Sequence, residues 1–190
     1  MNRPFNDQPI EILIDQNLLQ EGTILDLRLK YIGDRGMEYL SQCAKLVNLR
    51  ELKLERNEIT DLGIQALAES TILTSIKSLN LERNSIGDEG VRSISLSPLF
   101  SHLTALNLWK NQVGPEGAKA IAGSLVLGNL QRLDLAKNKI GDDGGKAFAE
   151  SQTLTSLKYV DLFGNVISQE TQEIIKESLN FKNLQHLVLE

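Results

Sequence analysis

The sequence predicts an α/β solenoid, in which right-handed coils stack into an open arc with a parallel β-sheet on the concave face and helices on the convex face. Two observations support this prediction. Apolar residues recur at a fixed interval of 27 residues along nearly the whole chain. Within each interval, the apolar spacing changes from the alternation of a strand to the periodicity of a helix. Because one such unit cannot bury its own apolar side chains, the units must stack on one another.

The strand of each unit follows from two apolar columns that keep their register without insertion or deletion. The first column is Leu27, Leu54, Leu81, Leu108, Leu135, Leu162 and Leu189. The second column lies two residues earlier and is Leu25, Leu52, Leu79, Leu106, Leu133, Val160 and Leu187. These columns predict seven short parallel strands in a repeat domain covering residues 22–190, preceded by a terminal segment of residues 1–21.

The helix and the return loop of each unit follow from the residues after the strand. A third apolar column has helical spacing relative to its neighbours and comprises Leu40, Leu67, Ile94, Ile121, Phe148 and Ile175. Each unit thus begins with the pattern L-x-x-L-x-L-x-x-N-x-I, as in residues 49–59 (LRELKLERNEI) and 130–140 (LQRLDLAKNKI). This pattern resembles the leucine-rich repeats of the ribonuclease-inhibitor type. The resemblance implies a scaffold that binds proteins with its concave face and strand-end loops.

The polar residues that recur in the same register are interpreted as structural. We expect the amides of Asn57, Asn84, Asn111, Asn138 and Asn165 to bond unpaired backbone groups of the turns. A later slot holds Asp34, Asp61, Asp88, Pro115, Asp142 and Gln169. It predicts the first position of a helix, where proline is favoured and aspartate complements the helix dipole. The following glycine column is expected to permit close packing between coils. Cys43 shares its slot with serines, and we expect this slot to require a small side chain packed beneath the helix.

The composition excludes several classes of function. The formal net charge is −5, so nucleic-acid binding is not expected. No apolar run approaches the length of a membrane span, no secretory signal is recognisable at the N-terminus, and the single cysteine fits a reducing compartment. We therefore expect a cytoplasmic protein, or one in the host cytosol if it is a secreted bacterial effector. No motif for a metal, a cofactor or a nucleophile with its base is present, so we expect no cofactor and no enzymatic activity.

The two ends of the solenoid need protection from solvent. Ile10, Leu13 and Leu19 lie one period before residues of the first helix, so residues 1–21 are expected to include a partial coil that acts as a cap. The stretch "IEILID" also has the pattern of a strand, and its secondary structure is left open. The chain ends on a strand, which predicts possible end-to-end contact through an uncapped last coil.

The candidate binding residues lie at strand positions that alternate with the core leucines, because alternate side chains of a strand face opposite sides of the sheet. Trp109 and Phe163 are large aromatic residues expected to face solvent, and such residues commonly anchor protein interfaces. A basic line runs beside them, flanked by Glu55 and Glu82. The predicted partner-binding residues are Lys53, Arg56, Arg83, Trp109, Lys110, Arg132, Asp134, Lys137, Tyr159, Asp161 and Phe163. The alternative is that Trp109 packs over its neighbours and that the charges pair along the sheet.

The sequence therefore favours a non-catalytic scaffold that binds a protein partner. Two alternatives remain open at this point. Because Ran GTPase-activating proteins resemble this repeat type, the chain could be a GTPase-activating or regulatory protein, with Arg83 and Asn107 as generic candidates in a strand-end loop. It could also be the recognition domain of a larger ligase or bacterial effector.

Overall fold

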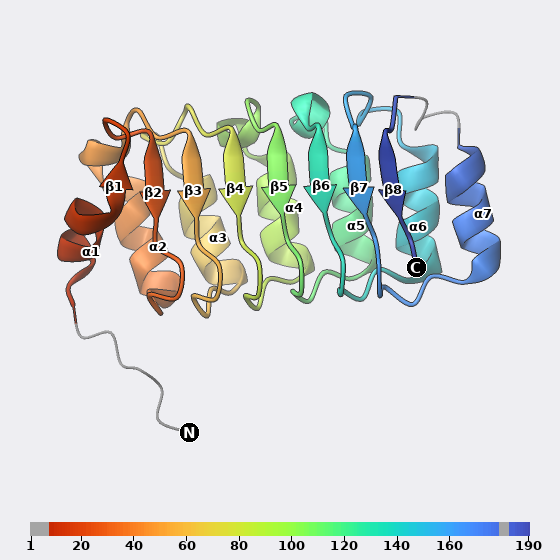
Figure 1. Cartoon of the computed structure of the whole chain (residues 1–190), viewed down its shortest axis with the longest axis horizontal. Coiled ribbons are helices and arrows are strands. Elements are labelled where there is room, and N and C mark those ends of the chain that lie inside the picture. The colour runs from red at the N-terminus through yellow and green to blue at the C-terminus, as the bar shows by residue number, and fades with distance from the viewer. Residues whose placement is uncertain (1–7, 179–182) are drawn as a thin grey trace, which may run out of the picture.

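The computed structural model describes residues 8–178 and 183–190, and Figure 1 shows the strands side by side in one row with helices α2–α7 behind them. The strands follow one another across a single sheet in chain order. They are β1 (Leu18–Leu19), β2 (Ile24–Asp26), β3 (Glu51–Lys53), β4 (Ser78–Asn80), β5 (Ala105–Asn107), β6 (Arg132–Asp134), β7 (Tyr159–Asp161) and β8 (His186–Val188). The α-helices are α1 (Ile10–Asn17), α2 (Gly33–Gln42), α3 (Asp61–Ala68), α4 (Asp88–Leu96), α5 (Pro115–Ala122), α6 (Gly141–Glu150) and α7 (Gln169–Glu177).

The register of the sheet confirms the 27-residue period. Strands β2 to β8 are parallel, and Leu52 pairs with Leu25 on one side and with Leu79 on the other. The leucines of both strand columns from Leu25 to Leu162 are at most 1% exposed, as is Val160. Short 3₁₀ turns at Ala44–Leu46, Pro98–Phe100 and Leu127–Asn129 return the chain from a helix to the next strand. The predicted coil is therefore the repeating unit of the fold.

The first residues of the chain differ from the expected partial coil. "IEILID" belongs to helix α1, and β1 pairs with β2 in the antiparallel direction. Leu13 is buried, as the period predicts, but Leu19 is 48% exposed and Ile14 is buried in its place. The 27-residue register fails here because α1 and β1 do not follow the order of strand and helix in the other coils. Residues 1–7 of the expected terminal segment lie outside the described residues.

The asparagine column forms the expected ladder of hydrogen bonds between coils. The Nδ2 of Asn111 donates to the carbonyls of Leu81 (3.0 Å) and Leu108 (3.1 Å), which lie in successive coils. Its Oδ1 accepts from the backbone N–H of Ile86 at 3.0 Å. Asn138 makes the same set of bonds one coil further on. Each buried amide thus satisfies backbone groups of two coils, which would otherwise be left unpaired in the core.

The aspartate column marks the start of the helices, as the sequence predicts, and it also has a role between coils that the sequence did not reveal. Asp88 is the first residue of α4. Its Oδ1 accepts from the backbone N–H of Gly114, at the start of α5, at 2.6 Å. A Cβ added to Gly117 would lie 2.6 Å from the same oxygen, so the glycine column makes room for this carboxylate. The column therefore joins the start of one helix to the carboxylate of the previous coil.

Pro115 interrupts the aspartate column, and the next coil replaces the hydrogen bond that an aspartate would have made. The backbone N–H of Gly141 has no carboxylate to meet and donates to the carbonyl of Asn165 at 3.1 Å. Gly141 reaches this bond with a φ of +62°, a conformation that glycine adopts without steric cost. As a result, α6 begins one residue earlier in its coil than α3, α4, α5 and α7 do.

The serines that share a slot with Cys43 form a second ladder, which the expectation of a merely small side chain missed. The Oγ of Ser124 donates to the carbonyl of Ser95 at 2.6 Å and accepts from the backbone N–H groups of Val126 and Leu127 at 3.2 Å. Ser70, Ser97, Ser151 and Ser178 donate to the previous coil in the same way. Two polar ladders thus run along the solenoid, one after the strands and one after the helices.

Replacing Asn111 with alanine tests the first ladder. The change leaves the buried N–H of Ile86 without its acceptor, so we expect the free energy of unfolding to fall by about 2–3 kcal/mol. Urea denaturation followed by circular dichroism measures this loss. The neighbouring Gln112 is exposed, and Gln112→Ala is expected to change the free energy by less than about 0.5 kcal/mol. Equal effects of the two substitutions would show that the amide ladder does not hold the coils together.

Candidate partner-binding face

The sheet exposes one face, away from α2–α7, and the first and third residues of each strand lie on it. These residues are half-buried in nearly every coil, whereas the middle residue is buried. The third residue is more constrained than its variable identity indicates. The side chains of Asp134 and Asp161 accept the backbone N–H two residues later, at 3.1 and 3.0 Å. Asn107 does the same at 2.8 Å. The two predicted binding carboxylates therefore also stabilise the ends of their own strands.

Trp109 lies between two cationic side chains from the neighbouring coils. The guanidinium carbon of Arg83 is 4.6 Å from the centre of the indole, and the Nζ of Lys137 is 5.4 Å from it. The Nε of Arg83 also lies 3.5 Å from Oε1 of Glu82, which is within ion-pair range but outside hydrogen-bond geometry. The fold therefore brings three of the predicted residues together across three coils. These contacts orient the half-buried indole and hold it in place.

A second cluster lies on β6 and β7. The guanidinium carbon of Arg132 sits 3.7 Å from the centre of the Tyr159 ring, and the Tyr159 hydroxyl donates to Oδ2 of Asp161 at 3.1 Å. The ring of His186, on β8, is 6.3 Å from that of Tyr159. Phe163 follows the same strand as Tyr159 and is 42% exposed. The aromatic residues of the sheet face thus gather on the C-terminal half of the solenoid.

The N-terminal half of the face carries charges that pair with a residue two positions away in the same coil. Lys53 lies 3.2 Å from Glu51, and Arg28 lies 2.6 Å from Asp26. The fold does not bring Lys53 into either aromatic cluster. Such half-exposed pairs contribute little to stability. This part of the face matches the alternative in which neighbouring charges neutralise each other along the sheet.

The predicted basic line has a backbone feature that the sequence did not reveal. Arg56, Arg83, Lys110 and Lys137 all have positive φ angles, between 53° and 56°. Their backbone N–H groups donate to the following coil, as Lys137 does to Phe163 at 2.7 Å. Residues other than glycine rarely adopt this conformation, which costs roughly 1–3 kcal/mol unless the surroundings enforce it. The asparagine ladder and these bonds between coils enforce it here.

Burial shifts the ionisation of two carboxylates on the face. Burial raises the pKa of Asp134 above its ordinary value, and the nearby negative charge of Asp161 raises it further, against the hydrogen bond from Ala136. Burial likewise raises the pKa of Glu55, although the amide of Asn80 donates to its Oε1 at 2.8 Å. Ionisation of either carboxylate therefore lowers the free energy of unfolding of the protein.

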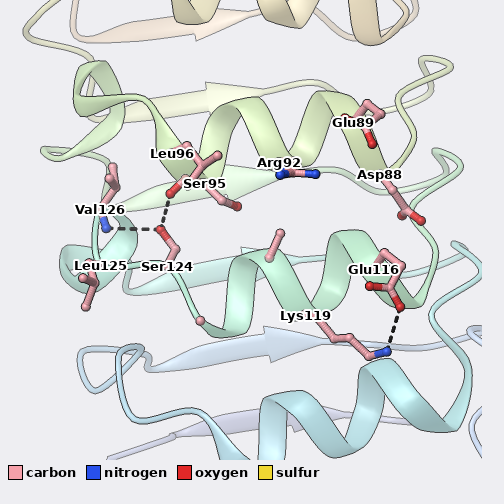
Figure 2. Close-up of a pocket in the computed structure, with 12 residues that line it drawn as sticks. Asp88, Glu89, Arg92, Ser95, Leu96, Glu116, Lys119, Ser124, Leu125 and Val126 are labelled. Atoms are coloured by element: carbon pink, nitrogen blue, oxygen red, sulfur yellow. Dashed lines mark hydrogen bonds and ion pairs between the residues drawn. The ribbon is translucent and has the colours of Figure 1, made fainter.

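The helix side of the solenoid carries a separate groove of about 690 Å³ between α4 and α5 (Figure 2). Leu96 and Leu125 lie at one end of it and are 66% and 90% exposed. Charged residues line the other end, where Lys119 bonds Glu116 at 2.7 Å. None of the predicted binding residues lies in this groove. The sequence could have pointed to this groove, because the slot of the exposed Leu96 holds the polar residues Gln42, Glu69, Glu150 and Glu177 in other coils.

Sequence comparison supports the assignment that the fold defines. The family described as "Leucine Rich repeat" matches residues 45–68, 73–95, 101–122 and 129–149. The chain is a leucine-rich-repeat protein, and its fold is the solenoid of that class. A comparison with curated protein sequences finds no match.

Solved structures with a similar chain path are distant in sequence. One is "Crystal structure of TLR13-ssRNA13 complex", with 20% identity and a TM-score of 0.46 over 83% of this chain and 23% of that one. Another is an internalin (inlF) from Listeria monocytogenes str. 4b F2365, with 20% identity and a TM-score of 0.44 over 77% of this chain and 49% of that one. A third is "Crystal structure of Rad7 and Elc1 complex in yeast", with 12% identity and a TM-score of 0.36 over 95% and 66%. The chain thus spans only part of the length of each.

Two further properties concern the residues that the structure describes. Among them, no group of three or more His, Cys, Asp or Glu side chains is placed to hold a metal ion. None of the described helices has the length and apolar content needed to cross a bilayer.

Replacing Asp134 with asparagine tests the electrostatics of the face. The amide keeps the acceptor for the N–H of Ala136, as Asn107 does in the previous coil, but removes the half-buried charge. Because the folded-state pKa is raised, the charge disfavours folding increasingly as the pH rises from about 4 through that value. We therefore expect Asp134→Asn to raise the unfolding temperature at pH 7 by about 1–2 °C.

The gain should vanish below about pH 4, where the carboxyl is protonated in both states. Thermal unfolding scans across this pH range measure it. Glu38 is exposed in the middle of α2, and Glu38→Gln serves as the matched control with no expected change. A lower unfolding temperature for Asp134→Asn at pH 7 would mean that the charge makes a stabilising contact.

Proposed function

We propose that this protein is a non-catalytic binding module whose concave sheet face and strand-end loops receive a partner protein. The observation that carries the proposal is the gathering of aromatic side chains on the C-terminal half of the sheet face. Trp109, Tyr159 and Phe163 all lie there, and cations from neighbouring coils contact two of the three rings. Trp, Tyr and Arg are the residues that most often dominate the energy of protein interfaces.

The exposure and the rigidity of these residues support the proposal. Phe163 is 42% exposed, although covering it would gain hydrophobic free energy. Trp109 is held between Arg83 and Lys137, so little conformational entropy remains to be lost when a partner binds. An anchor that is already ordered in the free protein contributes more to affinity than a mobile one.

The surrounding charges fit a polar rim around this apolar centre. Arg132 lies over the ring of Tyr159, and Asp161 accepts a hydrogen bond from its hydroxyl. The exposed Lys110 follows Trp109 in the chain. Lys53 and Arg56 lie on and after β3, two coils from Trp109. We propose that these two residues contact the edge of the partner and steer its approach, since charges at a rim act mainly on association rate.

Substitution of the half-buried Trp109 and of the exposed Phe163 tests the proposal. We expect Phe163→Ala and Trp109→Ala each to weaken the binding of a partner identified by affinity purification. The loss of binding free energy should be roughly 2 kcal/mol, or about thirtyfold in Kd. Phe163→Ala should leave the free energy of unfolding within about 0.5 kcal/mol of the unmodified chain, because its ring is partly solvated. Isothermal titration calorimetry and urea denaturation measure the two quantities separately.

Leu62 provides the matched control, because it is 67% exposed and lies on α3, on the opposite side of the coil. Leu62→Ala should not change the affinity of the same partner. Retained affinity in both aromatic variants would refute the proposed face. Unfolding of both variants would show that the rings belong to the folded core.

A further inference from the structure

We propose that the partner contacts this protein through an acidic segment that carries an apolar side chain, docked where strands β5, β6 and β7 end. This surface consists of residues 109–114, 136–141 and 163–168 and is called the strand-end surface below. The inference rests on the proposed function and names the chemistry of the partner at one part of it.

The strand-end surface is continuous across three coils. The backbone N–H of Lys110 donates to Ala136, and that of Lys137 donates to Phe163, at 2.8 and 2.7 Å. Further along the turns, the N–H of Lys139 donates to Val113 at 2.8 Å. These bonds fix the three turns side by side. An extended segment crossing them would therefore meet a rigid surface about three strand spacings wide, or roughly 14 Å.

The charge of the strand-end surface has one sign. It contains Lys110, Lys137 and Lys139 and no aspartate or glutamate, although the chain as a whole is acidic. The equivalent turns of the two earlier coils, residues 55–60 and 82–87, each combine an arginine with one or two glutamates. All three lysines are exposed. The charged side chains of this surface therefore offer a partner only positive charge, whereas the earlier turns offer both signs. The carboxylates of Asp88, Asp134, Asp142 and Asp161, which border the surface, each accept a backbone N–H of it.

Val166 adds an apolar contact in an unfavourable backbone conformation. It is 90% exposed and has a φ of +55°, a region that β-branched residues avoid. The same slot holds Ser85, Gln112 and Lys139, and also Tyr31 and Glu58, which share the positive φ, but no other β-branched residue. Exposure and strain both disfavour valine here in the free protein. Contact with an apolar side chain of a partner would explain the choice, and Phe163 lies three residues away to extend the contact.

Lys137 joins the charged and the aromatic parts of the surface. Its Nζ lies over the Trp109 ring, and a Cβ added to Gly164 would lie 3.4 Å from its Cγ. The stem of Lys137 is thus held between two coils, beside the ring that anchors the proposed interface. A carboxylate bound to this ammonium would be positioned next to Trp109.

Selection from a display library of short random peptides tests the inference. We expect the peptides enriched on the unmodified chain to combine Asp or Glu with an adjacent aromatic or aliphatic residue. A synthetic peptide of the most enriched sequence should bind about tenfold more weakly to Lys137→Glu and to Lys139→Glu, and binding should weaken as salt is added. Fluorescence anisotropy of the labelled peptide measures these changes.

Two matched controls separate this surface from general charge and apolar effects. Lys158 donates to Gln131 at 3.2 Å, as Lys139 donates to Gln112 at 3.3 Å. Lys158 lies just before β7, however, on the side of the sheet where the strands begin. Lys158→Glu should therefore leave peptide binding unchanged. Val166→Asn should weaken binding severalfold without lowering the unfolding temperature, because asparagine tolerates positive φ. Leu62→Asn removes an exposed apolar residue elsewhere and should have no effect.

The inference is overturned if the enriched peptides are basic or uncharged, if no peptide is enriched, or if Lys158→Glu weakens binding as much as Lys139→Glu does. It is also overturned if a labelled oligothymidine binds through these lysines and acidic peptides do not. A partner protein whose affinity depends on Trp109 but not on Lys137, Lys139 or Val166 would refute the inference and leave the proposed function intact. A partner that depends on none of them would refute both.

Discussion

The structure depends on one constraint: the backbone groups buried where each strand ends must find hydrogen bonds, and an asparagine amide supplies them. Asn111 bonds three backbone groups in two coils, and Asn138 repeats the arrangement. Because the amide reaches into the preceding coil, it fixes the distance and the rotation between coils. The parallel register of the sheet and the alignment of the turns follow from that fixed relation.

This constraint also determines which residues are free to vary. The leucines, asparagines and serines hold the coil, together with the backbone bonds between successive turns. The side chain of the first residue of each strand, and most side chains of the turn other than the asparagine, make few bonds that the fold requires. The third residue is intermediate, since Asp134 and Asp161 each bond the strand end. The chemistry of the surface therefore resides in departures from the repeat. Trp109, Phe163 and Val166 on the sheet side and Leu96 on the helix side are such departures.

Sequence periodicity predicted the architecture because it depends on residues that occupy equivalent positions in every coil. It identified the seven parallel strands, the buried leucines and the asparagine ladder. It could not show which coil a side chain reaches, so it placed Asp88 at the start of α4 but missed the bond from Asp88 to the start of α5. It failed for α1, which lies outside the repeat. Of the candidate site, it named the aromatic residues, but the contacts of Arg83 and Lys137 with Trp109 depend on side-chain directions that a one-dimensional pattern does not contain.

The fixed span of the bonds between coils has a consequence for how such a protein changes over generations. Most bonds of the two ladders join residues 25 to 30 positions apart, in one coil and the next. Insertion of a single residue would misplace every partner in the affected coil. Duplication or loss of a whole coil preserves each bond, because the new neighbours present the same groups. The protein can therefore lengthen, shorten or exchange its surface in steps of 27 residues, and recombination at equivalent positions could move a block such as β5 to β7 into another solenoid of the same period.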